Sequence, residues 1–587
     1  MCGIVGVVGA AAEDNIVEKI IDGLEKLEYR GYDSSGIAVV RDGGIECLRA
    51  VGKLQNLKMK LENVRMRGSV GIGHTRWATH GKPAENNAHP IVSGGVAIVH
   101  NGIIENYLQL KAELQKQGFV FKTETDTETV AHLLQRETAA GLSPREAFRN
   151  VLGMTEGSYA IAAIFSSLPN TLFVVGNRSP LAVGTGENMC AGSDVNALSS
   201  LCDEVVYPRD GEWAEITAND VLFFDKDFNE IRPKKHRVCE SCIGGGKGEY
   251  AHHMLKEIME QPNAVRRTLL YNKTEPDFKD VSEILILACG TSNYAGMVAK
   301  YWFEKFLRIP TNVEIASEYR YRSPVISDGT LAIAVTQSGE TVDTLEALEY
   351  VHKYGNAKTA ALANVRNSAV SRVSDFVFYT EAGIEVGVAS TKTFTAQLAI
   401  LAGIAFCRFP DLIGELQKLP ELCEKTLELN DEIRDLAGKI SSTNSAVYLG
   451  RGPLYPIALE GALKLKEVSY IHAEGFAAGE MKHGPIALID DNIPVICLCP
   501  YDELFEKTSS NVRMALARGK NIIVFTDAKG AKLLPTETTK IILPEVRSEF
   551  APILYVIPLQ LLAYHTAVLR GADVDKPRNL AKSVTVE

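Results

Sequence analysis

The sequence predicts a mixed α+β domain at the amino end, followed by two copies of one parallel α/β domain. Three observations predict this arrangement. At 587 residues the chain is too long for a single hydrophobic core. Its first 238 residues contain many short strand-like runs, whereas the chain after residue 248 alternates strand, glycine turn and helix. This second half also repeats itself at an offset of 162 or 163 residues.

Short apolar runs in residues 1–238 predict the strands of the first domain, and one amphipathic run predicts a helix. Residues 14–27 are predicted to form a helix, because Ile16, Ile20, Leu24 and Leu27 line one face and Asp14 is a plausible N-cap. The strand-like runs are residues 3–8, 36–40, 96–99, 160–165 and 172–175.

Residues 239–248 are predicted to be a linker between the halves. They contain Cys239 and Cys242 and then a glycine-rich run, which is typical of a flexible connection. The two cysteines could be half of a zinc site, but no second half follows nearby in the sequence. We therefore predict no metal and no cofactor.

Four matched pairs of segments establish the repeat in the second half. Each copy places its strand-to-helix turns at the carboxyl edge of a parallel sheet, where such folds bind ligands. We predict the copies at residues 249–430 and 431–572, followed by a polar tail at 573–587. The matched pairs are residues 284–290 with 447–452, 331–336 with 494–499, 358–362 with 520–524, and the helices that open at Ala389 and Ala551.

Composition and charge exclude several classes of protein. A net charge of −11 and a pI of about 5.7 argue against nucleic acid or an anionic membrane surface as a partner. Eleven scattered cysteines, an odd number, indicate a reduced cytoplasmic protein. The apolar start lacks a basic segment and runs into Glu13, so it is not a signal peptide. We also expect no membrane span, because no apolar stretch approaches eighteen residues.

Cys2 directly follows the initiator methionine. If Met1 is removed, Cys2 carries a thiol and a free α-amine on one residue. An α-amine titrates near ~8 and can therefore take the proton of the thiol, which gives a nucleophile with its own base. The alternative is a small apolar residue that opens a buried strand.

Two further clusters in the first domain suit an amide substrate. Arg76, between His74 and His80, would hold a carboxylate bidentately. Asn101 and Gly102, at the end of the strand-like run 96–99, would make an oxyanion hole. Alternatively, the two histidines are satisfied core residues.

A third cluster, residues 124–128, supplies a carboxylate. Asp126 could pair with a substrate ammonium. A solvated charged turn explains Asp126 about as well.

Hydroxyl-rich turns mark the first parallel copy. Residues 336–341 read Thr-Gln-Ser-Gly-Glu-Thr between a strand and a helix, which suits a phosphate held by neutral donors and helix N–H groups. Residues 289–292 and 388–391 repeat the arrangement. The alternative is ordinary N-capping by serine and threonine.

The second copy lacks the hydroxyl-rich turn and has a charged helix instead. Glu460, Lys464 and Glu467 share one helical face. Together with His483 they could transfer protons on a carbonyl sugar. The alternative is a helix surface with stabilising ion pairs.

The motifs of the first half, in their order, resemble the glutaminase domain of the N-terminal-nucleophile amidotransferases, an αββα sandwich. These motifs are residues 2–6, 30–34, 74–81, 100–102 and 125–128. The resemblance implies that Cys2 forms a γ-glutamyl thioester and releases ammonia, with Asn101 and Gly102 as the oxyanion hole. It implies glutamine binding by Arg76, Trp77, Thr79, His80 and Asp126, and a role for Trp77 in gating an internal ammonia tunnel.

The second half resembles tandem sugar-isomerase (SIS) domains. With the first half, nearly the whole chain resembles the isomerising amidotransferases that act on fructose 6-phosphate. The resemblance implies Lys464 as the Schiff-base amine, Glu467 as the group that moves a proton between C1 and C2, and His483 in ring opening. It also places Glu460 and Lys582 in the catalytic site. The implied sugar-phosphate ligands are Thr291, Ser292, Thr336, Gln337, Ser338, Thr341, Val388 and Ser390; at position 336 the family commonly has serine.

The resemblance implies a class II amidotransferase that makes glucosamine 6-phosphate, the first step of UDP-N-acetylglucosamine synthesis. Its partners would be the two small-molecule substrates and a second copy of the chain, in a cytoplasmic homodimer. One alternative is an amidotransferase that acts on phosphoribosyl pyrophosphate or aspartate, which the repeat argues against. Another is a sugar-phosphate-sensing regulator, which the acidic balance and the Cys2 cluster disfavour.

Overall fold

The computed structural model describes residues 2–9, 15–78, 80–238, 246–271 and 278–584. The chain divides into two compact units, residues 1–244 with 583–587, and residues 245–582. Four residues that the sequence singled out lie outside the described residues: Asp14, Thr79, Cys239 and Cys242. The predicted domain limits stay a prediction.

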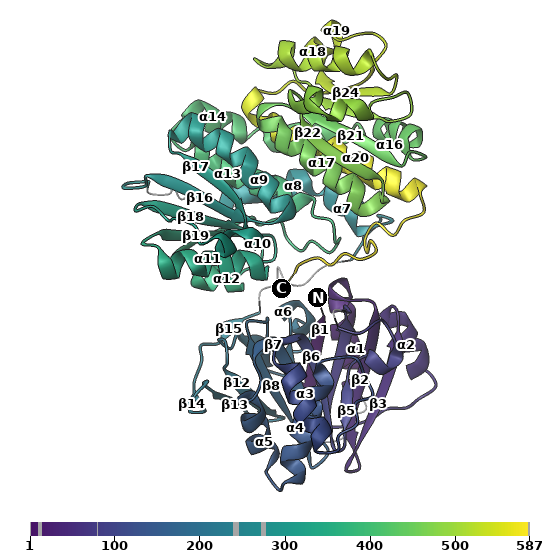
Figure 1. Ribbon diagram of the computed structural model, residues 1–587, viewed down its shortest axis with the longest axis vertical. Helices are drawn as coiled ribbons and strands as arrows, with labels where there is room; N and C mark the ends of the chain where they lie inside the picture. Colours follow the sequence, from purple (N-terminus) through teal and green to yellow (C-terminus); the bar gives the residue numbers. More distant parts are fainter. Residues whose placement is uncertain (1, 10–14, 79, 239–245, 272–277, 585–587) are drawn as a thin grey trace. The chain divides into compact units, whose positions relative to one another are not determined.

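The first unit contains two antiparallel sheets (Figure 1). The eight-stranded sheet has the order β15 (His236–Arg237), β11 (Glu204–Val206), β9 (Ala182–Thr185), β10 (Met189–Gly192), β1 (Gly3–Val8), β4 (Val70–Arg76), β2 (Ser34–Arg41), β3 (Gly44–Val51). The seven-stranded sheet has the order β14 (Glu230–Ile231), β13 (Val221–Phe224), β12 (Trp213–Thr217), β8 (Leu168–Asn177), β7 (Gly157–Phe165), β6 (Val96–Ile104), β5 (Ile91–Ser93).

Alternation along the strands explains why the sheets stack between helices. On β1, Ile4 and Val8 belong to the core that both sheets share, whereas Val5 and Val7 pack with α1 on the outer face. The helices of that outer face are α1 (Ile16–Leu27), α2 (Leu54–Leu61) and α6 (Val195–Leu198). Those on the other outer face are α3 (Tyr107–Lys116), α4 (Thr127–Ala139) and α5 (Pro144–Leu152). The predicted αββα sandwich is confirmed.

The second unit contains two five-stranded parallel sheets with one topology. In each sheet the second strand along the chain lies at the edge, followed by the first, third, fourth and fifth. The orders are β17 (Thr311–Ile315), β16 (Glu283–Ala288), β18 (Thr330–Val335), β19 (Lys358–Ala363), β20 (Phe376–Tyr379), and β22 (His472–Ala477), β21 (Ser445–Gly450), β23 (Val495–Leu498), β24 (Ile522–Asp527), β25 (Thr539–Leu543). The predicted duplication of a parallel α/β domain is confirmed.

Helices join and cover these two sheets (Figure 1). One continuous hydrophobic core includes Ile286 of the first sheet and Ile496 of the second, so the two copies pack as one body. The helices are α7 (His253–Met259), α8 (Gln261–Tyr271), α9 (Gly290–Trp302), α10 (Ala316–Tyr319), α11 (Val342–Tyr354), α12 (Ala369–Val373), α13 (Lys392–Phe406), α14 (Pro410–Leu416), α15 (Leu419–Leu427), α16 (Asn430–Ile440), α17 (Tyr455–Ser469), α18 (Phe505–Leu516), α19 (Ala528–Leu533) and α20 (Ala551–Leu569).

One expectation about apolar length is wrong. The segment Ser548–Leu569, which contains α20, is long and apolar enough to cross a membrane, with a mean hydropathy of 1.5. Pro558 and Gln560 interrupt its apolar residues, so the sequence does not show one uninterrupted apolar run of eighteen residues. Because 89% of it is buried inside the second unit, it reads as a core helix.

Candidate active sites

Cys2 lies just before β1 and beside the end of β4. The register pairs Gly3 with Thr75, which brings Cys2 next to Trp77. The Trp77 amide donates a hydrogen bond to the Cys2 Sγ at 3.2 Å. Burial raises the pKa of the thiol, and this outweighs the opposite effects of the Trp77 hydrogen bond and of Arg76. The thiol therefore needs a base to become a nucleophile.

Asn101 and Gly102 lie inside β6, not at the end of a strand as predicted, because β6 continues to Ile104. The Asn101 Nδ2 donates to the Cys2 carbonyl oxygen at 3.0 Å, so the structure brings the predicted nucleophile and the predicted oxyanion hole together. Gly102 has a φ of 111°, and a Cβ there would meet the Ser158 carbonyl oxygen at 2.0 Å. Only glycine fits this position.

Arg76 ends β4 and is 3% exposed. Its Nη2 donates to the carbonyl oxygens of His80 and, at 3.1 Å, of Gly81. Its Nη1 is buried and has no partner among the described residues. A buried guanidinium nitrogen without an acceptor is costly, which favours an anionic ligand at this point. The neighbouring Trp77 packs edge-on against Tyr32.

Asp126 is 4% exposed, so the alternative of a solvated turn is wrong. Its carboxylate accepts hydrogen bonds from the backbone N–H groups of Ile104 at 2.8 Å and Thr127 at 3.0 Å, and it begins α4. His80 contacts the ring of Tyr107.

The three hydroxyl-rich turns precede α9, α11 and α13 in the first parallel copy. Their N-cap residues, Cys289, Thr341 and Thr391, make no side-chain capping bond. Simple N-capping therefore does not explain these turns.

Within the turn after β18, Ser338 accepts a hydrogen bond from the Glu340 amide at 3.1 Å. Gly339 has a φ of 68°, and a Cβ there would meet the Ser368 hydroxyl at 2.0 Å. The Gln337 Oε1 is buried without a partner among the described residues. Thr336 contacts Thr341 at 3.3 Å, and Ser292 accepts from Gln397 at 3.0 Å.

Helix α17 of the second copy presents its charged face inward. Glu460 is fully buried and Lys464 is 1% exposed, so the alternative of a helix surface with ion pairs is wrong. The Lys464 Nζ lies 2.5 Å from Glu467 and 3.6 Å from Glu460. Thr291 of the first copy donates to Glu460 at 3.4 Å. The two copies therefore meet at this cluster.

Burial and charge set the protonation of the α17 cluster. Burial raises the pKa of Glu460 to about 8, although the Lys464 ammonium acts in the opposite direction. For Lys464, burial acts to lower the pKa, but Glu460 and Glu467 together raise it.

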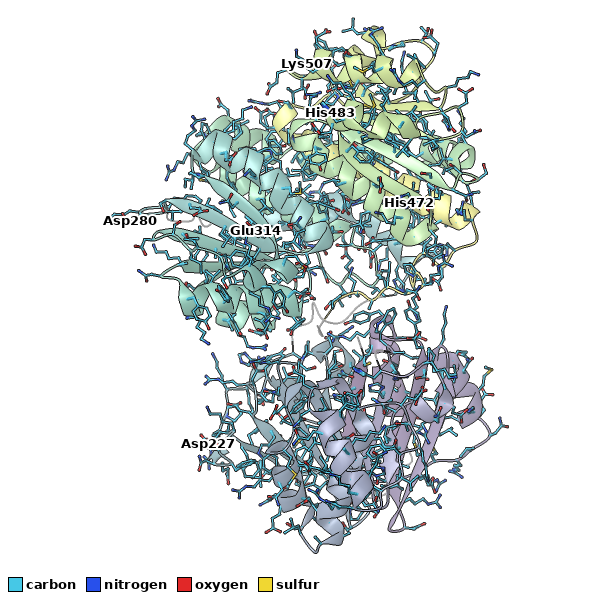
Figure 2. All side chains as sticks on the ribbon, in the orientation of Figure 1. Asp227, Asp280, Glu314, His472, His483 and Lys507 are labelled. Atoms are coloured by element: carbon cyan, nitrogen blue, oxygen red, sulfur yellow. The ribbon has the colours of Figure 1, made fainter. Side chains whose placement is uncertain are left out.

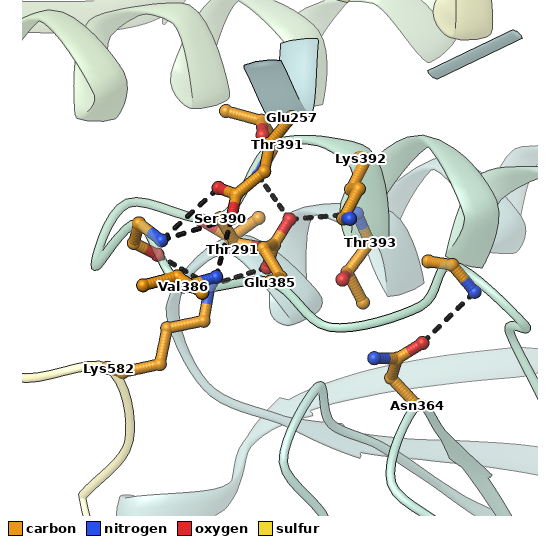
Figure 3. A network of polar contacts seen from close by, with 12 residues as sticks. Glu257, Thr291, Asn364, Glu385, Val386, Ser390, Thr391, Lys392, Thr393 and Lys582 are labelled. Carbon is orange, nitrogen blue, oxygen red and sulfur yellow. Dashed lines mark hydrogen bonds and ion pairs between the residues drawn. The ribbon is translucent and has the colours of Figure 1, made fainter. Parts of the chain in front are cut away.

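A network around Glu385 was not predicted from the sequence (Figure 3). Glu385 accepts hydrogen bonds from the Thr391 amide at 2.9 Å and the Thr393 amide at 3.0 Å, where α13 begins. Lys582, from the tail, lies 2.5 Å from the same carboxylate, and Ser390 donates to it at 3.0 Å. Burial alone would raise the pKa of Glu385, but the Lys582 ammonium lowers it to about 2.

Glu257 of α7 supports the same loop, because it accepts the amides of Val386 and Gly387. Burial, and then the nearby Glu385 charge, raise the pKa of Glu257 to about 7. Val388 donates its amide to the Asp575 carbonyl oxygen at 3.1 Å, which ties the tail to the loop. No sequence motif marks Glu257 or Glu385. The partners of Glu257 are about 130 residues away in the chain, and those of Glu385 on α13 follow no recognisable spacing.

His483 is not brought to the α17 cluster. It ends the short helical turn Glu480–His483, is exposed, and makes no hydrogen bond or ion pair to the other predicted site residues in the described part of the chain (Figure 2). Among the described residues, no group of three or more histidine, cysteine, aspartate or glutamate side chains could hold a metal ion.

Fold and sites together define a glutamine amidotransferase domain followed by two SIS domains. The glutamine amidotransferase domain model matches residues 74–200, and the SIS domain model matches residues 277–405 and 439–570. A protein of Bradyrhizobium diazoefficiens named glutamine–fructose-6-phosphate aminotransferase [isomerizing] is 48% identical over the full length of both chains. Proteins of the same name from Brucella abortus and Rhizobium meliloti are 47% and 46% identical over the same coverage.

A solved structure that resembles the second unit is among the matches. The C-terminal domain of glucosamine-fructose-6-phosphate aminotransferase from Francisella tularensis is 43% identical, with a TM-score of 0.54, and covers 57% of this chain and 100% of its own. The chain belongs to the isomerising glutamine–fructose-6-phosphate aminotransferase family.

Proposed function

We propose that this enzyme hydrolyses glutamine at Cys2 and uses the ammonia to aminate and isomerise fructose 6-phosphate to glucosamine 6-phosphate. The observation that carries the proposal is the presence of two sites in one chain. One is a thiol beside an asparagine amide and a buried arginine. The other is a buried cluster of lysine and carboxylates next to the hydroxyl-rich edge of a SIS sheet.

At the first site, Cys2 attacks the side-chain carbonyl carbon of glutamine. The α-amine freed by removal of Met1 takes the thiol proton and later gives it to the leaving ammonia. Asn101 and Gly102 stabilise the tetrahedral oxyanion. Water then hydrolyses the thioester to glutamate.

Five side chains hold the amino-acid end of glutamine. The unpartnered Arg76 Nη1 supports a bond to the α-carboxylate. Asp126 would receive the α-ammonium on its remaining lone pairs, because an ionised carboxylate has more acceptor sites than its two backbone donors occupy. Trp77, Thr79 and His80 are the other glutamine-binding residues predicted from the sequence.

At the second site, the turn after β18 holds the phosphate. Thr336, Gln337, Ser338 and Thr341 supply neutral donors beside the start of α11, where N–H groups favour an anion. Sugar hydroxyls are held by Thr291, Ser292, Val388 and Ser390.

Two lysines compete for the role of Schiff-base amine. Only a neutral amine attacks a carbonyl, and Glu460 and Glu467 beside Lys464 raise its pKa and so hold it in the charged form. Lys582 has one carboxylate partner among the described residues, Glu385. If Lys582 moves away to react, Glu385 still accepts hydrogen bonds from Ser390, Thr391 and Thr393. These contacts favour Lys582 over the predicted Lys464 as the attacking amine.

Lys464 then keeps Glu460 and Glu467 oriented, and Glu467 moves the proton between C1 and C2. His483 opens the sugar ring. His483 is exposed and makes no hydrogen bond or ion pair to the described residues of the cluster, which supports a site completed by a second copy of the chain, hence a homodimer. A cytoplasmic location stays a prediction.

The two candidate lysines can be separated by trapping. Borohydride reduction in the presence of fructose 6-phosphate fixes the sugar on the amine that formed the Schiff base, and peptide mass spectrometry locates it. An adduct on Lys582 agrees with this proposal, whereas an adduct on Lys464 restores the assignment from the sequence.

The function itself is tested by incubating the purified protein with glutamine and fructose 6-phosphate. We expect glutamate and glucosamine 6-phosphate in equal amounts. Cys2→Ala should abolish glutamine-dependent synthesis but leave isomerisation of the sugar phosphate. Glutamate without amino sugar would indicate another amidotransferase, and sugar-phosphate binding without turnover would indicate a regulator.

A further inference from the structure

His74 lies on β4 of the first unit and contacts Asn101 of β6, in the facing sheet. The His74 Nε2 is 3.0 Å from the Asn101 Oδ1 and 3.1 Å from the His100 carbonyl oxygen. The imidazole is fully buried, and burial lowers its pKa to about 3. It is therefore neutral at physiological pH and carries a single N–H.

The His100 carbonyl decides which nitrogen carries that proton. A backbone carbonyl oxygen can only accept, so the Nε2 facing it must be the donor. With the proton on Nδ1, the Nε2 lone pair would face two oxygens at hydrogen-bond distance. The third neighbour of Nε2, the His89 Nδ1, lies farther away at 3.3 Å and can accept as well as donate, so it does not offset the two oxygens. The buried His74 Nδ1 has no partner among the described residues.

The same argument fixes the amide of Asn101. The atom that faces a donating Nε2 must be an acceptor, which is the amide oxygen. The amide NH₂ then points to the other side, where it meets the Cys2 carbonyl oxygen at 3.0 Å. A flipped amide would present an oxygen to the developing oxyanion and repel it.

We propose that His74 is a positioning residue of the glutaminase site, whose Nε2–H holds the Asn101 amide with its NH₂ toward the oxyanion. This inference rests on the proposed function of Cys2 and Asn101. His74 touches neither the substrate nor the thiol; it acts through Asn101. The orientation is set by the His100 carbonyl oxygen, which can only accept a hydrogen bond.

The test compares two reactions of Cys2 in the full-length protein. Glutamine hydrolysis passes through an oxyanion, whereas alkylation by iodoacetamide forms a sulfur–carbon bond as iodide leaves and has no oxyanion. His74→Leu removes the donor and should lower kcat for glutamine by about 10²-fold, the usual cost of an oxyanion donor, with KM within about twofold. The rate of Cys2 alkylation, followed by mass spectrometry of the amino-terminal peptide, should stay within about twofold.

Two further variants keep the test decisive. His74→Gln places an amide N–H near the position of Nε2 and should retain activity within about tenfold, which separates the hydrogen bond from mere packing. His132→Leu removes another buried histidine of the same domain, one that bonds Ser93, and should leave kcat unchanged.

Three results would overturn the inference. They are an unchanged kcat in His74→Leu, a parallel loss of hydrolysis and alkylation, or a loss in His74→Gln as large as in His74→Leu. If His74→Leu does not fold, His74→Gln decides alone, and a loss of kcat well above tenfold in that variant would overturn the inference. A wild-type protein without glutaminase activity, or a Cys2→Ala variant that keeps it, would instead refute the proposed function.

Discussion

The two SIS domains share one topology but differ at the edge of the sheet where such folds bind ligands. In the first domain, the strand β19 is followed by Asn364, whose backbone N–H donates a hydrogen bond to the Gln337 carbonyl oxygen at 3.0 Å. The strand registers align Leu362 with Phe525, so the equivalent residue in the second domain is Asp527. Its carboxylate accepts the Tyr501 amide and, at 2.9 Å and 3.0 Å, the amides of Lys529 and Gly530.

The difference indicates that the two copies of the domain have different roles. A neutral asparagine leaves the first edge compatible with a phosphate, whereas a carboxylate at the second edge both occupies the N–H groups and repels an anion. The second domain contributes α17 instead, whose Glu460 contacts Thr291 of the first. We therefore expect the edge of the first domain to bind the phosphate and the second domain to supply the acid–base groups.

The largest effect is expected for Glu467→Gln, which removes a proton carrier that the second domain supplies. Synthesis of glucosamine 6-phosphate should fall by about 10²–10⁴-fold, while glutamine hydrolysis remains. Product and glutamate are measured in the same reaction. Glu474→Gln is the matched control, because Glu474 is a partly exposed glutamate of the same domain whose ion-pair partner among the described residues is His472. Unchanged synthesis in Glu467→Gln would refute its assignment.

Equivalent substitutions at the two edges test whether only the first binds phosphate. Ser338→Ala removes a hydroxyl from the first edge and should raise KM for fructose 6-phosphate by about 10-fold, the worth of a hydrogen bond to a charged group. Tyr501→Ala, at the equivalent position of the second edge, should leave KM unchanged. Equal effects of the two variants on KM would contradict the claim that only the first edge binds phosphate.

Exchanging Asn364 and Asp527 for each other's residue type tests whether charge causes the difference between the two edges. Asn364→Asp places a negative charge beside the phosphate turn and should raise KM several-fold, most strongly at low salt. Asp527→Asn weakens a helix cap and should cost about 1 kcal/mol of stability without a change in KM. Steady-state kinetics at two salt concentrations and thermal unfolding measure both. A salt-independent effect of Asn364→Asp would argue against electrostatics as its cause.

The smallest effect concerns the stability of the second unit against pH. Because the folded pKa of Glu460, about 8, exceeds its ordinary value of 4.5, the folded state binds the proton more tightly. The corresponding stability is present below pH 4.5 and is lost as pH rises through about 8. The melting temperature of the wild type should therefore fall more between pH 6 and pH 9 than that of Glu460→Gln. Parallel melting curves at both pH values would contradict a protonated Glu460.

Sequence reasoning predicted what depends on local pattern. The offset of the repeat predicted the two sheets, and the spacing of Glu460, Lys464 and Glu467 predicted a shared face. It could not tell that this face is buried, because burial depends on how α17 packs on the other copy.

Long-range contacts explain what was missed. Glu257 and Val386 meet across 129 residues of chain, and no spacing encodes such a contact. The apolar run 96–99 ends before Asn101, which predicts the end of a strand there. In the structure β6 continues and pairs with β7 as far as Ile104. Thr79 and the two linker cysteines lie outside the described residues.

The central claim, that one chain makes ammonia at Cys2 and consumes it at the SIS domains, is tested most directly by isotope transfer. The wild type is incubated with fructose 6-phosphate, glutamine labelled with ¹⁵N in its side-chain amide, and an excess of unlabelled ammonium. Mass spectrometry of the glucosamine 6-phosphate formed should show nearly complete ¹⁵N labelling, because the ammonia passes between the sites without mixing with the solvent. Unlabelled product, or no amino sugar at all, would contradict the account.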